Sequence, residues 1–323
     1  MIDISIIIPV YNVDNYIVRC LDSVFKQEFD GTFEVIAVDD CSTDNSLEKL
    51  KLYSEKEPGL QIINHAENKK LSLARNTGIN AAKGNYIMHI DSDDWIEEST
   101  LQTLYNEIKR TAADVIVYDY FNFYDNNEIK YNNSIKENLF TDKKSQVKDC
   151  FLGTSVTKLV KRKLTKKLIV SEYSFNSGED LIYCAEIFLK AKTFSLIKQP
   201  LYAYFQNLNS ITHAVNNSEF LNSRLFLLER LNEIYKKHEL NESFNSKVLE
   251  KMKKDIVLAV FRIWVSEFNF NKREFILRLK RLKGVDELFL ITVERSMNSF
   301  MFSFYYMIKE FGIKRTFFNL FRN

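Results

Sequence analysis

The decisive stretch of this sequence reads Asn85-Tyr86-Ile87-Met88-His89-Ile90-Asp91-Ser92-Asp93-Asp94-Trp95. Its apolar run predicts a buried strand, and three carboxylates follow where that strand ends. In an open α/β sheet, ligands bind just beyond the carboxyl ends of the strands. A divalent cation that carries a polyphosphate would relieve the repulsion among the three acids, because Mg²⁺ usually takes one or two carboxylates plus phosphate oxygens. The alternative is an acidic turn in which Ser92 or Asp93 caps a helix that begins near Glu97.

The composition excludes several classes of protein. Lys and Arg number 45 against 43 Asp and Glu, so no basic field for binding nucleic acid is expected. The four cysteines (20, 41, 150 and 184) are widely spaced and lack zinc-site spacing, so we expect reduced thiols in a cytoplasmic protein. The N-terminus lacks a basic region typical of a signal peptide, and no apolar run is long enough to predict a spanning helix.

Strands and helices are predicted to alternate along the first third of the chain. Apolar, β-branched runs predict strands at residues 4–10, 33–38, 60–64, 85–90 and 115–118. The helix after the first strand would be capped by Asp14 or Asn15, and the helix over 71–82 would be closed by Gly84. Further helices are predicted around Leu47–Tyr53 and over 98–110. This alternation predicts an α/β fold with a doubly wound, mainly parallel sheet.

A second acidic segment, Asp39-Asp40-Cys41-Ser42-Thr43-Asp44, follows the strand at 33–38. Because parallel strands end at the same edge of a sheet, Asp40 and the Asp91–Asp94 segment would open on one crevice. Two such segments predict a nucleotide-diphosphate site. The sequence contains neither a G-x-G-x-x-G nor a Walker glycine loop, which argues against dinucleotide and P-loop chemistry.

Five ordered motifs resemble those of bacterial family 2 glycosyltransferases of the GT-A fold: residues 5–12 (SIIIPVYN), 38–44 (VDDCSTD), 74–79 (ARNTGI), 82–87 (AKGNYI) and 91–94 (DSDD). The resemblance covers about the first 120 residues strongly. Two departures stand out, since Cys41 and the pair Lys69-Lys70 occupy positions where the family often has glycine. The second departure bears on the shape and charge of the diphosphate pocket.

The resemblance implies roles for the residues that match its motifs. Pro9, Tyr11 and Asn12 would shape the base and ribose pocket, and Asp40 would accept a hydrogen bond from the base, which favours uracil. The remaining donor-side residues are Arg75 near the diphosphate and Asp91 at the ribose, with Ser92 beside it. For Arg75 the alternative is a surface arginine that pairs along its own helix.

The resemblance also implies a metal ion and a general base. Asp93 would bind Mn²⁺ or Mg²⁺, and His213 could complete the metal shell or be a structural or solvated histidine. Asp94 is either a metal-site support or a helix cap. In Gly178-Glu179-Asp180, the family pattern makes Asp180 the general base and leaves Glu179 as the fallback. The alternative for Asp180 is the N-cap of the helix that follows.

Outside these motifs the sequence is less specific. Residues 122–141 read as a polar loop or an edge region that borders the acceptor side. Residues 158–167 read as either a solvated helix face or a contact for an anionic acceptor or diphosphate, and residues 201–205 as a segment that closes the acceptor side. We expect a catalytic domain at 1–215, with a nucleotide-sugar half at 1–95 and an acceptor half at 96–215. Helical periodicity predicts a C-terminal appendage at 216–323.

Several roles stay open for this appendage. It could form a dimer surface, contact the inner face of the cell membrane as a peripheral platform, or pack on the rest of the chain.

The resemblance thus implies an inverting, metal-dependent transferase. It would move a sugar from a nucleotide-sugar, with UDP favoured, to a hydroxyl of a surface glycan or lipid-linked acceptor. The alternatives are a nucleotidyltransferase and a non-catalytic glycan- or nucleotide-binding subunit. Nucleic acid is not an expected partner.

Overall fold

The computed structural model describes residues 2–124, 126–132, 154–168 and 178–206, and a few residues between 226 and 280. The chain divides into two compact units, Met1–Ser210 and Ile211–Asn323. The predicted boundary after residue 215, His213, Cys150 and nearly all of the predicted helical appendage lie outside the described residues. None of the described helices is both long and apolar enough to cross a membrane.

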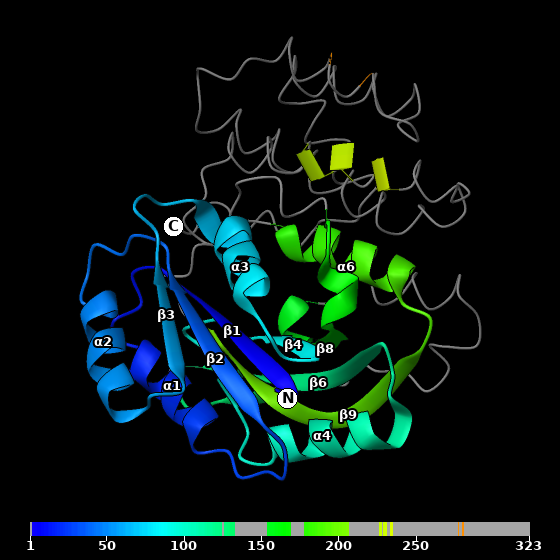
Figure 1. Ribbon diagram of the computed structural model, residues 1–323, viewed down its shortest axis with the longest axis horizontal. Helices are drawn as coiled ribbons and strands as arrows, with labels where there is room; N and C mark the ends of the chain where they lie inside the picture. The colour runs from blue at the N-terminus through cyan, green and yellow to red at the C-terminus, as the bar shows by residue number, and fades with distance from the viewer. Residues whose placement is uncertain are drawn as a thin grey trace. The chain divides into compact units, whose positions relative to one another are not determined.

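The described strands form one mixed sheet in the order β3-β2-β1-β4-β8-β6-β9-β5, with β7 paired to β6 (Figure 1). Its first half is parallel and contains β1 (Ile4–Val10), β2 (Phe33–Asp39), β3 (Leu60–Asn64) and β4 (Tyr86–His89). The α/β class is therefore confirmed, and these four strands lie where the sequence pattern predicts them.

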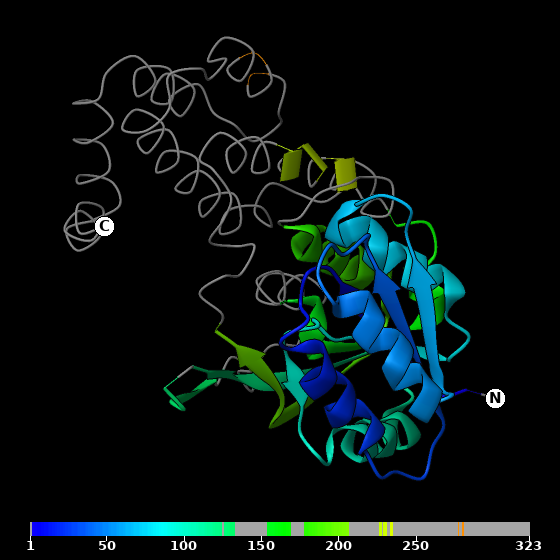
Figure 2. The ribbon, with the colours of Figure 1, turned by 90° about the vertical axis from the view of Figure 1, so that its left-hand side faces the viewer.

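Beyond β4 the sheet becomes mixed. β8 (Lys158–Lys161) is antiparallel to both β4 and β6 (Val115–Phe123), whereas β9 (Phe194–Phe205) is parallel to β6. The short β5 (Trp95–Ile96) and β7 (Ile129–Asn132) pair antiparallel with β9 and β6. In the turned view of Figure 2, the hairpin of β6 and β7 extends away from the parallel strands. Residues 122–123 and 129–132 thus belong to strands, which agrees with the predicted edge region rather than with a loop.

Helices cover both faces of the sheet because side chains alternate along each strand. Ile4, Ile6 and Ile8 pack in one layer with apolar residues of α1 (Ile17–Phe25), α2 (Ser46–Lys56) and α4 (Thr100–Thr111). Ile7 packs in the opposite layer with α3 (Lys70–Ala81). Helix α6 (Glu179–Lys190) lies beside α3 in both ribbon views, and its Tyr183 ring contacts His89 of β4.

Three predictions of the residues that cap or close helices are wrong. Helix α1 begins after Tyr16, and no side chain caps it, so neither Asp14 nor Asn15 has that role. Helix α4 begins at Thr100, because Trp95 and Ile96 first pair with β9 as β5; Ser92, Asp93 and Asp94 therefore cap no helix. Helix α3 ends at Ala81, with extended backbone at Ala82, so Gly84 does not close it.

The basic segment at 158–167 does not form the solvated helix face that was one prediction. Residues 158–161 are strand β8, and residues 162–165 form a 3₁₀ turn. Lys158 is 2% exposed, and its Nζ donates to the Thr154 carbonyl at 2.6 Å and to Thr157 Oγ1 at 3.2 Å. Such hydrogen bonds offset part of the free-energy cost of removing the ammonium group from water.

Candidate functional site

The loops that follow β1 and β2 interlock at the carboxyl edge of the sheet. Pro9 is buried in β1, and Tyr11 is 37% exposed just beyond it. The Oδ1 of Asn12 accepts a hydrogen bond from the Thr43 N–H at 2.8 Å, and the Asn12 N–H donates to Ser42 Oγ at 3.2 Å. The side chains predicted to shape the base pocket therefore lie next to the segment that contains Asp40.

Asp40 binds the start of helix α3. One of its carboxylate oxygens accepts from the Lys69 N–H at 2.8 Å, and the other accepts from the Lys70 N–H at 2.7 Å. Its Oδ1 also pairs with His65 Nδ1 at 2.7 Å, and His65 Nε2 lies 2.9 Å from Thr77 Oγ1. Helix N-termini have unpaired N–H groups that a carboxylate satisfies well. His65 was missed by the sequence analysis, and base recognition by Asp40 stays a prediction.

The two departures from the family pattern have a backbone explanation. Cys41 has φ 62° and Lys70 has φ 74°, both in the left-handed region that glycine adopts most easily. Each non-glycine residue there carries a steric cost of roughly 1–2 kcal/mol. A glycine at either position would adopt this backbone around Asp40 without that cost.

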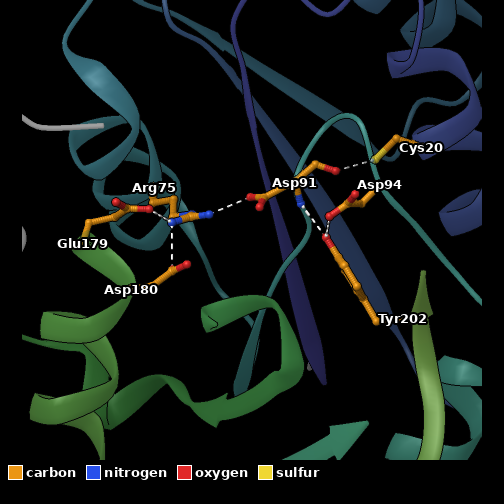
Figure 3. A network of polar contacts seen from close by, with 7 residues as sticks. All are labelled: Cys20, Arg75, Asp91, Asp94, Glu179, Asp180 and Tyr202. Carbon is orange, nitrogen blue, oxygen red and sulfur yellow. Dashed lines mark hydrogen bonds and ion pairs between the residues drawn. The ribbon is translucent and has the colours of Figure 1, made fainter. Parts of the chain in front are cut away.

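Arg75 joins three carboxylates from two distant segments (Figure 3). Its Nη2 donates to Asp91 Oδ1 at 2.6 Å, and its Nη1 lies 2.6 Å from Glu179 Oε1 and 3.0 Å from Asp180 Oδ1. Arg75 is 6% exposed, so the alternative of a surface arginine paired along its own helix is wrong. The structure thereby brings together four predicted site residues from α3, the end of β4 and the first turn of α6.

The two acids at the start of α6 have different electrostatic surroundings. Burial and then the neighbouring Asp180 charge raise the pKa of Glu179 to about 7. Burial also opposes ionisation of Asp180, but the charge of Arg75, followed by the neighbouring Ser155 and the charge of Lys158, outweighs it and holds the pKa of Asp180 below its usual value. The N-cap of α6 is Gly178, so the alternative of Asp180 as N-cap is wrong. Asp180 has the ionisation expected of a proton acceptor at neutral pH.

Two residues of strand β9 form hydrogen bonds with the acidic turn after β4. The Tyr202 hydroxyl donates to Asp94 Oδ2 at 2.5 Å and accepts from the Asp91 N–H at 3.1 Å, and the Phe205 N–H donates to Asp94 Oδ1 at 2.7 Å. Asp94 is thus a support of the turn, one of its two predicted roles. Burial and then the charges of Asp93 and Asp91 raise the pKa of Asp94. Ser92 is buried in the turn, and Asp93 is half-buried.

The turn offers carboxylate oxygens, the kind of ligand that a divalent cation takes. Asp93, to which the resemblance assigns the metal, is half-buried in the same turn as Asp91, which pairs with Arg75, and Asp94, which accepts a hydrogen bond from Tyr202. Within the described residues, no three His, Cys, Asp or Glu side chains form a metal-binding group. A cation at Asp93 would therefore take its other ligands from a bound diphosphate, as Mg²⁺ commonly does.

Known proteins match this fold and this order of motifs. Residues 5–169 match the family model described as glycosyl transferase family 2. The chain belongs to glycosyl transferase family 2. Glycosyltransferase GlyA of Streptococcus pneumoniae is 36% identical over 215 residues, which cover 62% of this chain and 30% of GlyA. The chain thus spans less than a third of that relative.

Solved structures show the same fold. Staphylococcus aureus TarS residues 1–349, crystallised with UDP-GlcNAc, is 22% identical with a TM-score of 0.62, and the match covers 90% of this chain and 79% of TarS 1–349. The mannosyltransferase PcManGT of Pyrobaculum calidifontis, in complex with GDP-Man and Mn²⁺, is 13% identical with a TM-score of 0.52 and coverages of 95% and 87%. The predicted GT-A fold is confirmed, and family 2 membership argues against the nucleotidyltransferase alternative.

Proposed function

We propose that this family 2 member transfers a sugar from a UDP-sugar to an acceptor hydroxyl and inverts the configuration at the anomeric carbon. The observation that carries the proposal is the Arg75 network, which links the acidic turn after β4 to the Glu179-Asp180 pair on α6. The likeness to a fold that holds UDP-GlcNAc in TarS supports the choice of donor.

Asp180 is the general base of the proposed reaction. Its carboxylate accepts the proton of the acceptor hydroxyl while that oxygen attacks the anomeric carbon from the face opposite the diphosphate. The new glycosidic bond forms as the bond from the anomeric carbon to the diphosphate oxygen breaks, and UDP leaves with that electron pair. One displacement gives inversion. Arg75 holds Asp180 in place and keeps it ionised, and Glu179 is the fallback for the same role.

Asp93 is the proposed ligand of a Mn²⁺ or Mg²⁺ ion. The ion would neutralise charge that develops on the departing diphosphate. The Mn²⁺ in the PcManGT complex supports a metal in this fold. His213 lies outside the described residues, and its two predicted roles, a further metal ligand or a structural or solvated histidine, stay predictions.

The donor pocket would be formed by residues at the strand ends. Asp40 would read the base beside Pro9, Tyr11 and Asn12, while Asp91 and Ser92 would lie at the ribose. For the acceptor we propose a hydroxyl of a surface glycan or lipid-linked glycan. A cytoplasmic location, membrane contact and dimerisation through residues 216–323 stay predictions.

The test uses purified protein, a panel of sugar nucleotides and Mn²⁺ or Mg²⁺, with release of nucleoside diphosphate as the measurement. With the active donor, Asp180→Asn is expected to lower turnover at least about a hundredfold, as loss of a general base does. Asp93→Ala is expected to lower turnover by at least about as much, because the leaving diphosphate would lose the ion that neutralises its charge. The anomeric configuration of the product, measured by NMR, should be opposite to that of the donor. A retained configuration or near-normal turnover in Asp180→Asn would contradict the proposed base.

A further inference from the structure

Helix α1 makes hydrogen bonds along the whole segment that carries the acidic turn. Arg19 Nη2 donates to the Asp93 carbonyl at 2.6 Å, and Cys20 Sγ lies 3.7 Å from the Asp91 carbonyl (Cys20 in Figure 3). Ser23 Oγ accepts from the Ile96 N–H at 3.2 Å. Just after the helix, Gln27 donates to the Glu97 carbonyl at 2.7 Å. One side of α1 therefore holds the backbone from residue 91 to residue 97.

Arg19 is the member of this set closest to the proposed metal ligand. Its guanidinium carbon lies 4.2 Å from the ring centroid of Trp95 and 4.6 Å from that of Phe205. A planar guanidinium can lie against aromatic rings and still donate hydrogen bonds from its edge, which a lysine ammonium cannot do in the same geometry. Arg19 of α1 thus contacts both the backbone of Asp93 in the turn and Phe205 of β9.

We propose that Arg19 is a positioning residue that fixes the backbone of Asp93, and thereby its carboxylate, for binding of a divalent cation. The inference rests on the proposed role of Asp93 as metal ligand. Residues that orient a metal ligand commonly change metal affinity by about 10–100-fold when they are replaced.

The sign of the effect separates positioning from simple electrostatics. Arg19 is positively charged and lies within electrostatic reach of Asp93 and Asp94. If charge alone mattered, removing this cation would strengthen the binding of another cation to the same carboxylates. A positioning role predicts the opposite, because a carboxylate without a fixed backbone must lose more freedom on binding the metal.

The experiment measures Mn²⁺ affinity at saturating UDP, from the EPR signal of free Mn²⁺, in the full-length protein. Arg19→Met is expected to weaken Mn²⁺ binding roughly tenfold. Arg19→Lys keeps the charge, so electrostatics predicts no change, whereas positioning predicts intermediate weakening. Lys109→Met is the matched control, because Lys109 Nζ lies 4.2 Å from the Tyr105 ring centroid on α4, away from the turn. Thermal unfolding of each variant shows whether it is folded.

The outcomes separate the inference from the proposed function. Wild-type or tighter Mn²⁺ affinity in Arg19→Met overturns the positioning role. If Arg19→Met does not fold, wild-type Mn²⁺ affinity in Arg19→Lys overturns that role instead. Asp93→Asn tests the proposed function separately. If Asp93→Asn binds Mn²⁺ as well as the wild type, or if the wild type binds none with UDP, the metal role of Asp93 fails. Loss of binding in Asp93→Asn with no effect in Arg19→Met or Arg19→Lys refutes the inference alone.

Discussion

At the scale of single residues, one guanidinium sets the chemistry of two adjacent acids. Arg75 Nη1 contacts both Glu179 and Asp180, yet the pKa of Glu179 is raised to about 7 while that of Asp180 is lowered. Lys158 adds positive charge near Asp180, whereas Glu179 is buried beside the Asp180 charge. Neighbouring acids whose pKa values are pushed apart take different roles in acid–base chemistry.

This difference predicts the pH dependence of turnover. A general base acts when it is deprotonated, so a lowered pKa moves the acid limb of the rate profile to low pH. If Asp180 is the base, it stays deprotonated between about pH 8 and 6. Its protonation is therefore not expected to lower kcat in that range. Glu179→Gln should keep the same profile, because removal of a neighbouring negative charge does not raise the pKa of Asp180. The measurement is kcat against pH for both proteins.

A fall in kcat below neutral pH would indicate that Glu179, and not Asp180, is the general base. Its pKa of about 7 would make wild-type turnover fall about tenfold per pH unit below neutrality. Glu179→Gln would then be inactive at every pH.

At the scale of elements, the site depends on how closely α3 and the loop after it approach the first strand. A Cβ added to Gly84 would lie 2.6 Å from the Ser5 backbone nitrogen and 2.9 Å from the Ile4 carbonyl carbon. The Gly84 N–H also donates to Ser5 Oγ at 2.8 Å. Gly84 thus serves close packing of the loop before β4, the strand that leads to the acidic turn.

Gly84→Ala is therefore expected to destabilise the protein. Because the added methyl group meets backbone atoms that cannot rotate away, the free energy of unfolding should fall by about 2–3 kcal/mol. Urea denaturation measures this change. Gly59→Ala is the matched control, since its added Cβ would lie 3.7 Å from the Phe25 ring, an ordinary contact. Equal stability of the two variants would contradict the close approach at Gly84.

At the scale of the whole molecule, the catalytic chemistry is assigned to the first of two units. The cores of the sheet consist of residues between Ile4 and Tyr202. The contacts that build the site among described residues join α1, α3, α6, β4 and β9, all within Met1–Ser210.

A fragment of residues 1–210 is therefore expected to fold by itself and to bind UDP. Its chemical denaturation should show one cooperative transition, as expected for a unit with its own core. A fragment of residues 1–193 is the control, because it lacks β9, which pairs with β5 and β6 and supplies Tyr202. That shorter fragment should not unfold cooperatively. A non-cooperative 1–210 fragment would refute the independent unit.

The sequence by itself determined the local elements and the chemical content of the site. Apolar runs located β1 to β4, and acids after β2 and β4 indicated the functional edge, because both signals depend on neighbouring residues. Only the tertiary structure decided which groups pair. Arg75 and Asp180 are 105 residues apart, and Tyr202 and Asp94 are 108 apart, so no local pattern predicts their contact. No local pattern predicts the hydrogen bonds of Asp40 with the start of α3 or of Arg19 with the Asp93 carbonyl either. Packing of separate elements against the sheet creates those contacts.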